Sequence, residues 1–168
     1  VNKKNLLMLA KHSKQRGIDS SGLIHFQNSK YQVDRADIDI EKLLTKVDPY
    51  NSNIVLGHSR LITNGLNDNQ PVIKKNLCVI HNGIITNEKE IWKNLKIKKE
   101  LDIDSEVIVA IASEHFKNRK PISDLSNKIL NLYKGIVACA LFVPEHGKII
   151  LFSNNGSLYT GVIDNDIY

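Results

Sequence analysis

The stretch Ile80-His81-Asn82-Gly83-Ile84 follows an apolar run and decides how the chain is interpreted. The Asn82 amide and the Gly83 backbone N–H are neutral donors that can point at one oxygen atom, as an acyl-transfer intermediate requires. Glycine also lets the backbone approach a bound molecule closely. Asn-Gly between apolar residues is equally a strong hairpin signal, so the stretch is ambiguous when taken alone.

Charged side chains on either side of this stretch add groups that suit an α-amino acid. Arg60 follows a predicted buried strand, and a guanidinium binds a carboxylate through two parallel hydrogen bonds. Thr63 could add a nearby hydroxyl. Asp104 precedes a predicted helix, where a carboxylate is either a cap or a counter-charge for an ammonium group. Together these groups match the zwitterion and the side-chain amide of one amino acid.

Hydrophobic periodicity and turn residues predict an α+β fold with antiparallel sheets, because paired strands alternate with groups of helices. Asn87, with Glu90 three residues later, is expected to cap a helix through reciprocal hydrogen bonds. Asp104 is a second candidate cap, and residues 19–22 are expected to form a turn. Other helices are predicted over residues 3–15, 38–47, 107–116 and 121–133. Strands are predicted over residues 23–26, 31–33, 54–58, 76–80, 136–143, 148–153 and 158–163.

Composition places the chain in the ordinary globular class, at 168 residues with 42% hydrophobic and 24% charged side chains. The net charge is +5, but the lysines are spread out and interleaved with glutamates, which favours a solvated surface over a nucleic-acid site. The apolar runs are too short to cross a membrane. Cys78 and Cys139 lie in apolar runs, which predicts buried, reduced thiols and a cytoplasmic protein.

Five motifs occur in a fixed order along the first two thirds of the chain. They are Arg16-Gly17-x-Asp19-Ser20-x-Gly22, Gly57-His58-x-Arg60-x-x-Thr63-x-Gly65, Asn69-x-Pro71, His81-Asn82-Gly83-x-Ile85 and Asp104-x-Glu106-Val107. This order resembles the glutaminase domain of glucosamine-6-phosphate synthases, which are class II, or N-terminal-nucleophile, glutamine amidotransferases. More loosely, it is similar to the same domain in amidophosphoribosyltransferases and asparagine synthetases.

The resemblance implies a four-layer αββα sandwich of two antiparallel sheets, the N-terminal-nucleophile hydrolase type. Residues 1–168 would form one glutamine amidotransferase type-2 domain, as a fragment that lacks the first strand and the C-terminal part. The implied oxyanion hole is Asn82 with the Gly83 N–H. The implied glutamine-binding residues are Arg60 at the carboxylate, Asp104 at the amino group, Thr63 nearby and His81 in support. The implied brace near the nucleophile is formed by Arg16 and Asp19.

The resemblance also implies a cysteine nucleophile at the first position of the mature chain, whereas this sequence begins with Val1. Buried cysteines in apolar strands are poor substitutes. We therefore expect an enzyme that converts L-glutamine to glutamate and ammonia, provided that a cysteine precedes Val1 in the full-length protein. The alternative is a non-catalytic domain that binds glutamine or serves as a scaffold.

The ammonia acceptor is expected to be a sugar phosphate resembling fructose 6-phosphate, as in amino sugar biosynthesis, bound by a domain C-terminal to residue 168. Leu61 and Asn64 stand where tryptophan and histidine are common in glucosamine-6-phosphate synthases. Asparagine-synthetase-like and phosphoribosyl acceptors therefore stay open as alternatives. We expect no metal, other cofactor, nucleic acid or membrane as a partner, and a homo-oligomer remains an open option.

Overall fold

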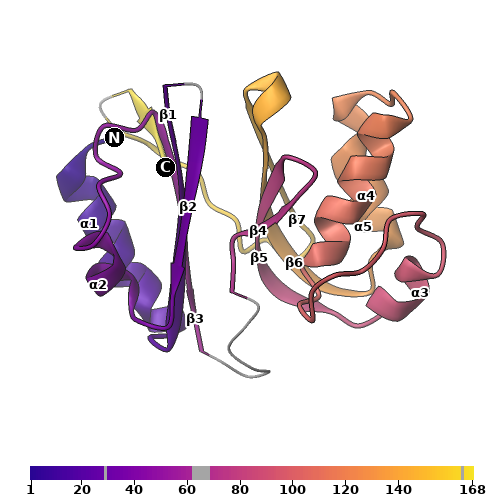
Figure 1. Cartoon of the computed structure of the whole chain (residues 1–168), viewed down its shortest axis with the longest axis horizontal. Coiled ribbons are helices and arrows are strands. Elements are labelled where there is room, and N and C mark those ends of the chain that lie inside the picture. Colours follow the sequence, from indigo (N-terminus) through magenta and orange to yellow (C-terminus); the bar gives the residue numbers. More distant parts are fainter. Residues whose placement is uncertain (29, 62–68, 164) are drawn as a thin grey trace. The chain divides into compact units, whose positions relative to one another are not determined.

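The computed structural model describes residues 1–28, 30–61, 69–163 and 165–168. These residues form two compact units, Val1–Pro71 and Val72–Tyr168. Each unit combines an antiparallel sheet with helices, so the predicted α+β class is confirmed (Figure 1). Within the described ranges, no helix combines the length and the apolar character that crossing a bilayer requires.

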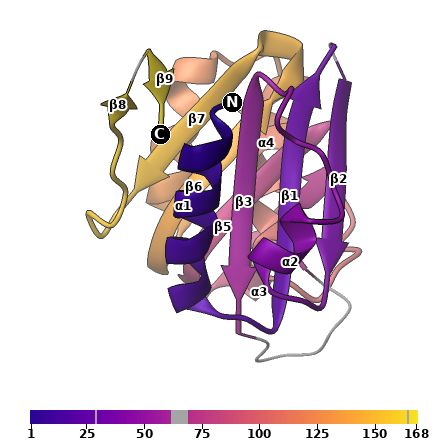
Figure 2. The ribbon, with the colours of Figure 1, turned by 90° about the vertical axis from the view of Figure 1, so that its left-hand side faces the viewer.

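The first unit is a three-stranded sheet in the order β2-β1-β3 with two helices on one of its faces (Figure 2). Its elements are α1 (Lys3–Ser13), a 3-10 turn (Lys14–Arg16), β1 (Ser20–Gln27), β2 (Lys30–Ala36), α2 (Ile40–Leu44) and β3 (Ile54–Arg60). The core of this unit consists of apolar side chains from both helices and from β1, namely Leu6, Ala10, Leu23, Ile40, Leu43 and Leu44. The first unit therefore consists of two layers, one of helices and one of strands.

The second unit is a four-stranded sheet in the order β4-β5-β6-β7, again with helices. Its strands are β4 (Val72–Lys74), β5 (Leu77–Ile85), β6 (Gly135–Val143) and β7 (Lys148–Ser153). Its helices are α3 (Glu88–Trp92), α4 (Glu106–Lys117) and α5 (Leu125–Leu132), with 3-10 turns at Ile122–Asp124 and Pro144–His146. A separate two-stranded ladder joins β8 (Val162–Ile163) to β9 (Asp166–Ile167).

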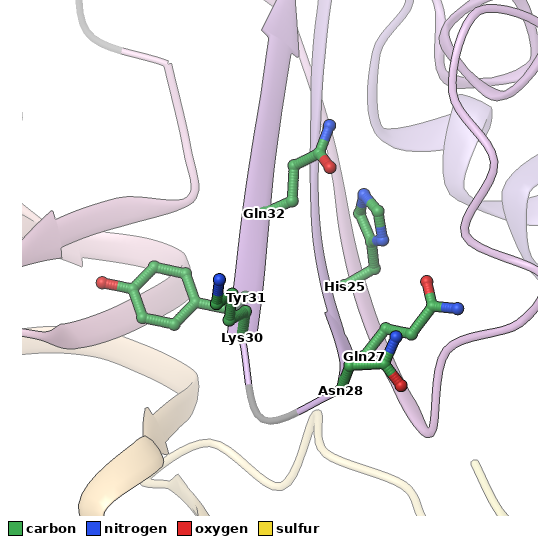
Figure 3. Close-up of a pocket in the computed structure, with 6 residues that line it drawn as sticks. All are labelled: His25, Gln27, Asn28, Lys30, Tyr31 and Gln32. Carbon is green, nitrogen blue, oxygen red and sulfur yellow. The ribbon is translucent and has the colours of Figure 1, made fainter.

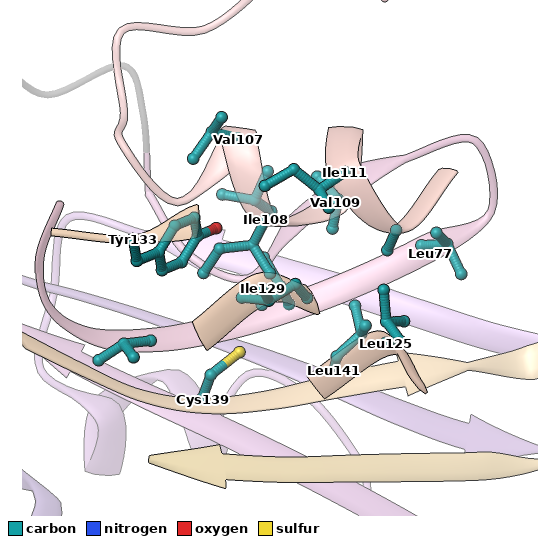
Figure 4. Packing of buried hydrophobic residues seen from close by; sticks show 14 of the residues in the cluster. Leu77, Val107, Ile108, Val109, Ile111, Leu125, Ile129, Tyr133, Cys139 and Leu141 are labelled. Atoms are coloured by element: carbon teal, nitrogen blue, oxygen red, sulfur yellow. The ribbon is translucent and has the colours of Figure 1, made fainter. Parts of the chain in front are cut away.

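The core of the second unit lies between this sheet and α4 and α5. Residues 107–112 of α4 are at most 1% exposed, so this helix is buried on every side over that stretch. Figure 4 shows Ile108 of α4, Ile129 of α5 and Cys139 of β6 within the cluster. Cys139 alternates with exposed or half-buried neighbours along β6, as expected for a strand that covers a core with one face.

Three strand predictions need correction. Residues 20–22 are not a turn, because β1 pairs with both β2 and β3 from its first residues. His81-Asn82-Gly83 does not follow a strand and is not a hairpin, since β5 continues through it to Ile85 while pairing with β6. The strand expected over 158–163 is reduced to Val162–Ile163.

The cap predicted at Asn87 is also wrong, although α3 does begin at the next residue. The Asn87 side chain donates from Nδ2 to the Leu132 carbonyl at 2.9 Å and accepts from the Lys134 N–H at 2.9 Å. Both amide groups are therefore occupied by the segment that joins α5 to β6. A short-range cap has been replaced by a long-range link that satisfies partly buried backbone groups.

Replacing Ile129 with alanine should lower the free energy of unfolding by about 2–5 kcal/mol, because Ile129 is fully buried between α5 and the sheet. Leu132→Ala on the same helix is the matched control, since Leu132 is 42% exposed. Its cost should stay within about 0.5 kcal/mol. Urea denaturation of both variants measures the difference, and equal costs would contradict the described core.

Candidate functional site

The Asn-Gly step is built into β5 at a point where two strand backbones touch. Asn82 and Gly83 pair with Ala138 and Val137 of β6. Gly83 has φ +145°, and a Cβ at this position would lie 1.9 Å from the Ile136 carbonyl oxygen. No residue with a side chain fits there without moving the strands. Glycine is thus required by the backbone itself, and its N–H is not shielded by a side chain.

The Asn82 side chain is exposed, beside this close contact. Among the residues that the structure describes, none forms a hydrogen bond with its amide. The amide is therefore available to a ligand. An amide donor next to an unshielded backbone N–H is the pair that an oxyanion hole requires.

His81 lies on the buried side of β5, at 2% exposure. Its Nδ1 lies 3.1 Å from the Ser105 hydroxyl and 3.9 Å from the nearer Asp104 carboxylate oxygen. Burial lowers the pKa of His81, and this outweighs the Asp104 charge and a hydrogen bond with the Ile136 backbone, which both raise it. The imidazole is therefore neutral near pH 7 and serves as a packed polar support.

Asp104 does not cap α4, in contrast to the prediction. The helix begins at Glu106, and the Asp104 carboxylate instead accepts the backbone N–H of Ile85 through Oδ2 at 3.0 Å. Its Oδ1 lies 3.4 Å from the Ser105 hydroxyl. The side chain is 28% exposed, so one carboxylate is both fixed to β5 and accessible to a cation. The second unit thus brings His81, Asn82, Gly83 and Asp104 together.

Arg60 belongs to the first unit, where it ends β3 and is half-buried. The Asp19 N–H donates to its carbonyl at 3.2 Å. Gly17 packs so closely on it that a Cβ would lie 2.1 Å from the Arg60 carbonyl carbon. The segment from Arg16 to Asp19 therefore braces the Arg60 backbone, while the Arg16 side chain is exposed. Thr63 lies outside the described residues.

The first unit also contains an open cavity of about 530 Å³ at the other end of its sheet from Arg60 (Figure 3). It is lined by His25, Gln27, Asn28, Lys30, Tyr31 and Gln32. The His25 ring lies 3.2 Å from the Ser52 hydroxyl and 3.3 Å from an Asp34 carboxylate oxygen. These groups satisfy one another, and the cavity contains none of the predicted site residues.

The two cysteines are free and buried, as predicted, each at 1% exposure. Burial raises the pKa of Cys139 well above its usual value, with a smaller contribution from Cys78. A thiol in this environment is a poor nucleophile. Within the described ranges, no group of three or more His, Cys, Asp or Glu side chains could hold a metal ion.

The sequence analysis assigned no role to two residues beside Asp104, although one of them, Glu106, is part of a quoted motif. Ser105, which is fully buried, contacts both His81 and Asp104. Glu106 forms a buried ion pair with Lys74 at 2.5 Å. The usable signal was Glu106 itself, a charged residue directly before the apolar run at the start of α4. Its partner on β4 carried no local signal.

Comparison with known proteins agrees with this geometry. The family described as "Glutamine amidotransferase domain" matches residues 58–166, which include Arg60, the Asn-Gly step and Asp104. The chain belongs to this glutamine amidotransferase domain family.

Among curated proteins, the chain is similar to glutamine–fructose-6-phosphate aminotransferases (isomerizing). It is 28% identical over 159 residues to that of Francisella tularensis subsp. tularensis, covering 88% of this chain and 26% of the relative. It is 27% identical over 179 residues to that of Wigglesworthia glossinidia brevipalpis, covering 98% of this chain and 29% of the relative. The chain thus spans little more than a quarter of the length of these relatives.

Two solved structures share the fold. The glutamine phosphoribosylpyrophosphate amidotransferase from B. subtilis superposes with a TM-score of 0.76 at 19% identity, covering 94% of this chain and 37% of that one. The structure described as the allosteric regulatory enzyme of purine biosynthesis superposes with a TM-score of 0.71 at 19% identity, covering 90% of this chain and 35% of that one. The chain therefore has the N-terminal-nucleophile fold that the motifs predicted.

Lowering the pH should destabilise the protein through His81. Folding lowers the pKa of His81, so the unfolded chain binds the additional proton. Stability is therefore lost as the pH falls through the ordinary histidine value of 6.5 toward the pKa in the folded protein. The slope reaches about 1.4 kcal/mol per pH unit. Urea midpoints should fall more steeply for the wild type than for His81→Gln, which has no such proton. Parallel pH profiles would contradict a lowered pKa.

Proposed function

We propose that this chain binds L-glutamine and supports its hydrolysis to glutamate and ammonia. The observation that carries the proposal is the Asn82–Gly83 donor pair on β5, with the partly exposed Asp104 carboxylate fixed to the same strand. The donor pair can stabilise the oxygen of an amide carbonyl as its carbon becomes tetrahedral. The Asp104 carboxylate can bind an α-ammonium group. The names of the family and of the curated relatives support glutamine as the ligand.

Arg60 is proposed to bind the α-carboxylate of L-glutamine, because a guanidinium offers paired donors to a carboxylate. Its backbone is braced by Gly17 and Asp19, which gives the side chain a rigid base. Thr63 is proposed to contribute a hydroxyl to glutamine binding. His81 supports β5 from its buried side and does not take part in proton transfer.

The nucleophile is proposed to be a cysteine that precedes Val1 in the full-length protein, because Cys78 and Cys139 are buried. Its thiolate would attack the amide carbon, and the negative charge would develop on the oxygen held by Asn82 and Gly83. Collapse of this intermediate breaks the C–N bond and releases ammonia once the nitrogen is protonated. Water then cleaves the thioester to give glutamate and the free thiol.

Both units are proposed to belong to one glutamine amidotransferase domain that delivers ammonia to an acceptor domain elsewhere in a cytoplasmic protein. The curated relatives favour a ketose phosphate such as fructose 6-phosphate as the acceptor, since that compound is in their names. The fold shared with a phosphoribosylpyrophosphate amidotransferase makes a phosphoribosyl acceptor the second candidate. Adding each acceptor to the full-length protein, and measuring which one accelerates glutamate release, separates the two.

Replacing Arg60 with alanine in the full-length protein should raise the glutamine KM by about 30-fold or more, as loss of a charged partner does elsewhere. The kcat should change less, because the α-carboxylate lies away from the reacting carbon. Glutamate release as a function of glutamine concentration measures both constants. Lys46→Ala removes one exposed positive charge from the same unit and is the control. An unchanged KM in Arg60→Ala would reject the carboxylate assignment.

Replacing Asn82 with alanine should lower kcat by about 100-fold or more while KM changes little, as loss of one oxyanion donor does elsewhere. The exposed amide makes no hydrogen bond within the described part of the chain, so the fold should be preserved. Asn53→Ala, which also removes an exposed amide, should leave kcat unchanged. A variant that turns over glutamine at the wild-type rate would remove Asn82 from the oxyanion hole.

A further inference from the structure

The second unit contains an ion pair that is almost completely removed from solvent. Lys74 ends β4 and its side chain is 4% exposed, while Glu106 begins α4 and its side chain is 1% exposed. The Lys74 Nζ lies 2.5 Å from a Glu106 carboxylate oxygen. Placing two charges in such surroundings is costly and contributes little net stability compared with apolar side chains. A role in holding a particular geometry fits such a pair better than a role in stability.

The Lys74 ammonium group and the Glu106 carboxylate each have several further hydrogen-bond partners. Lys74 also donates to the Lys98 carbonyl at 2.8 Å and lies 3.1 Å from a Glu100 carboxylate oxygen, so its three N–H groups meet three acceptors. These contacts outweigh burial and raise its pKa. Glu106 accepts the backbone N–H groups of Glu100, at 3.0 Å, and of Leu101, at 2.8 Å. The pair thus fastens the loop before α4 both to the sheet and to the first residue of the helix.

Asp104 lies between that fastened loop and the helix start. It is two residues before Glu106, and its carboxylate meets the Ile85 N–H on β5. Glu106 therefore fixes the backbone on one side of Asp104, and β5 fixes the carboxylate on the other. Without the ion pair, the loop would lose its attachment to β4 through Lys74, and the Asp104 carboxylate would be held by its contacts with Ile85, Ser105 and His81.

We propose that Lys74 and Glu106 are positioning residues that hold the Asp104 carboxylate in place for the α-ammonium group of the bound amino acid. This inference rests on the proposed glutamine site. Neither residue touches the substrate. Their effect is specific to one substrate group, because only the α-ammonium group meets Asp104.

A pair of ligands separates this role from a general structural one. Glutaramate is glutamine without its α-ammonium group, so the ratio of its Kd to that of L-glutamine reports the Asp104 contact alone. All Kd values are measured by calorimetry in the full-length protein with the proposed nucleophilic cysteine replaced by alanine, so that L-glutamine is not consumed. This protein should bind L-glutamine more tightly than glutaramate. Lys74→Met should weaken L-glutamine by about tenfold and glutaramate by less than about threefold. Asp104→Asn should lose the same preference, and adding Lys74→Met to it should lower the preference no further.

Two further variants guard against unfolding and charge effects. Lys74→Met with Glu106→Gln leaves no unpaired buried charge, and the amide oxygen can still accept the Glu100 and Leu101 N–H groups. This double variant should regain part of the preference for L-glutamine. Lys42→Met removes a lysine that is 73% exposed and pairs with Asp39 at 3.5 Å, and it should leave both Kd values unchanged.

The outcomes are distinct. Equal weakening of both ligands by Lys74→Met, in a variant that melts normally, would reduce the ion pair to a general structural role and overturn the inference. The inference would also be overturned if Lys74→Met and the double variant both kept the unaltered ratio of the glutaramate Kd to the L-glutamine Kd. A protein without these further substitutions that binds neither ligand would overturn the proposed function itself.

Discussion

The arrangement of polar groups in the second unit depends on one close approach, between the backbone at Gly83 on β5 and the Ile136 carbonyl on β6. Since no side chain fits between them, the two strands stay paired through the Asn-Gly step instead of separating into a turn. The pairing carries β5 on to Ile85, whose N–H meets the Asp104 carboxylate. The Asn82 and Gly83 donors are therefore part of the sheet, and the Asp104 carboxylate is hydrogen-bonded to the same strand. A regular strand holds such groups in place more precisely than a loop alone.

Hydrophobic periodicity was sufficient to predict the helices and strands in which it is regular. The helix α1 and the strands β6 and β7 were predicted close to their observed bounds, because their apolar residues repeat with the period of each structure. The class and the gathering of His81, Asn82, Gly83 and Asp104 followed from the ordered motifs. Composition and periodicity alone would not have predicted that these residues lie together. The prediction came from the order and spacing of several motifs, because no single residue shows that it belongs to a site.

The failures share a physical cause. An asparagine or an aspartate before a helix is equally suited to cap it or to reach a distant backbone group. Asn87 bonds a carbonyl 45 residues away, and Asp104 bonds an N–H 19 residues away. Lys74 finds its carboxylate 32 residues along the chain. Such partners are selected by packing, which the sequence does not display, so residue type alone predicted the hydrogen-bonding capacity but not the partner.

The position of Lys74 has a consequence for how the protein associates. The strand β4 is only three residues long and lies at the edge of its sheet, where unpaired backbone groups could recruit a strand from another molecule. A short edge that ends in an inward-pointing charge is a poor template for such pairing. A strand added there would disturb a buried ammonium group whose acceptors are already in place. Among the described residues, the short strand and its buried lysine are therefore two features that disfavour strand addition at this edge of the sheet.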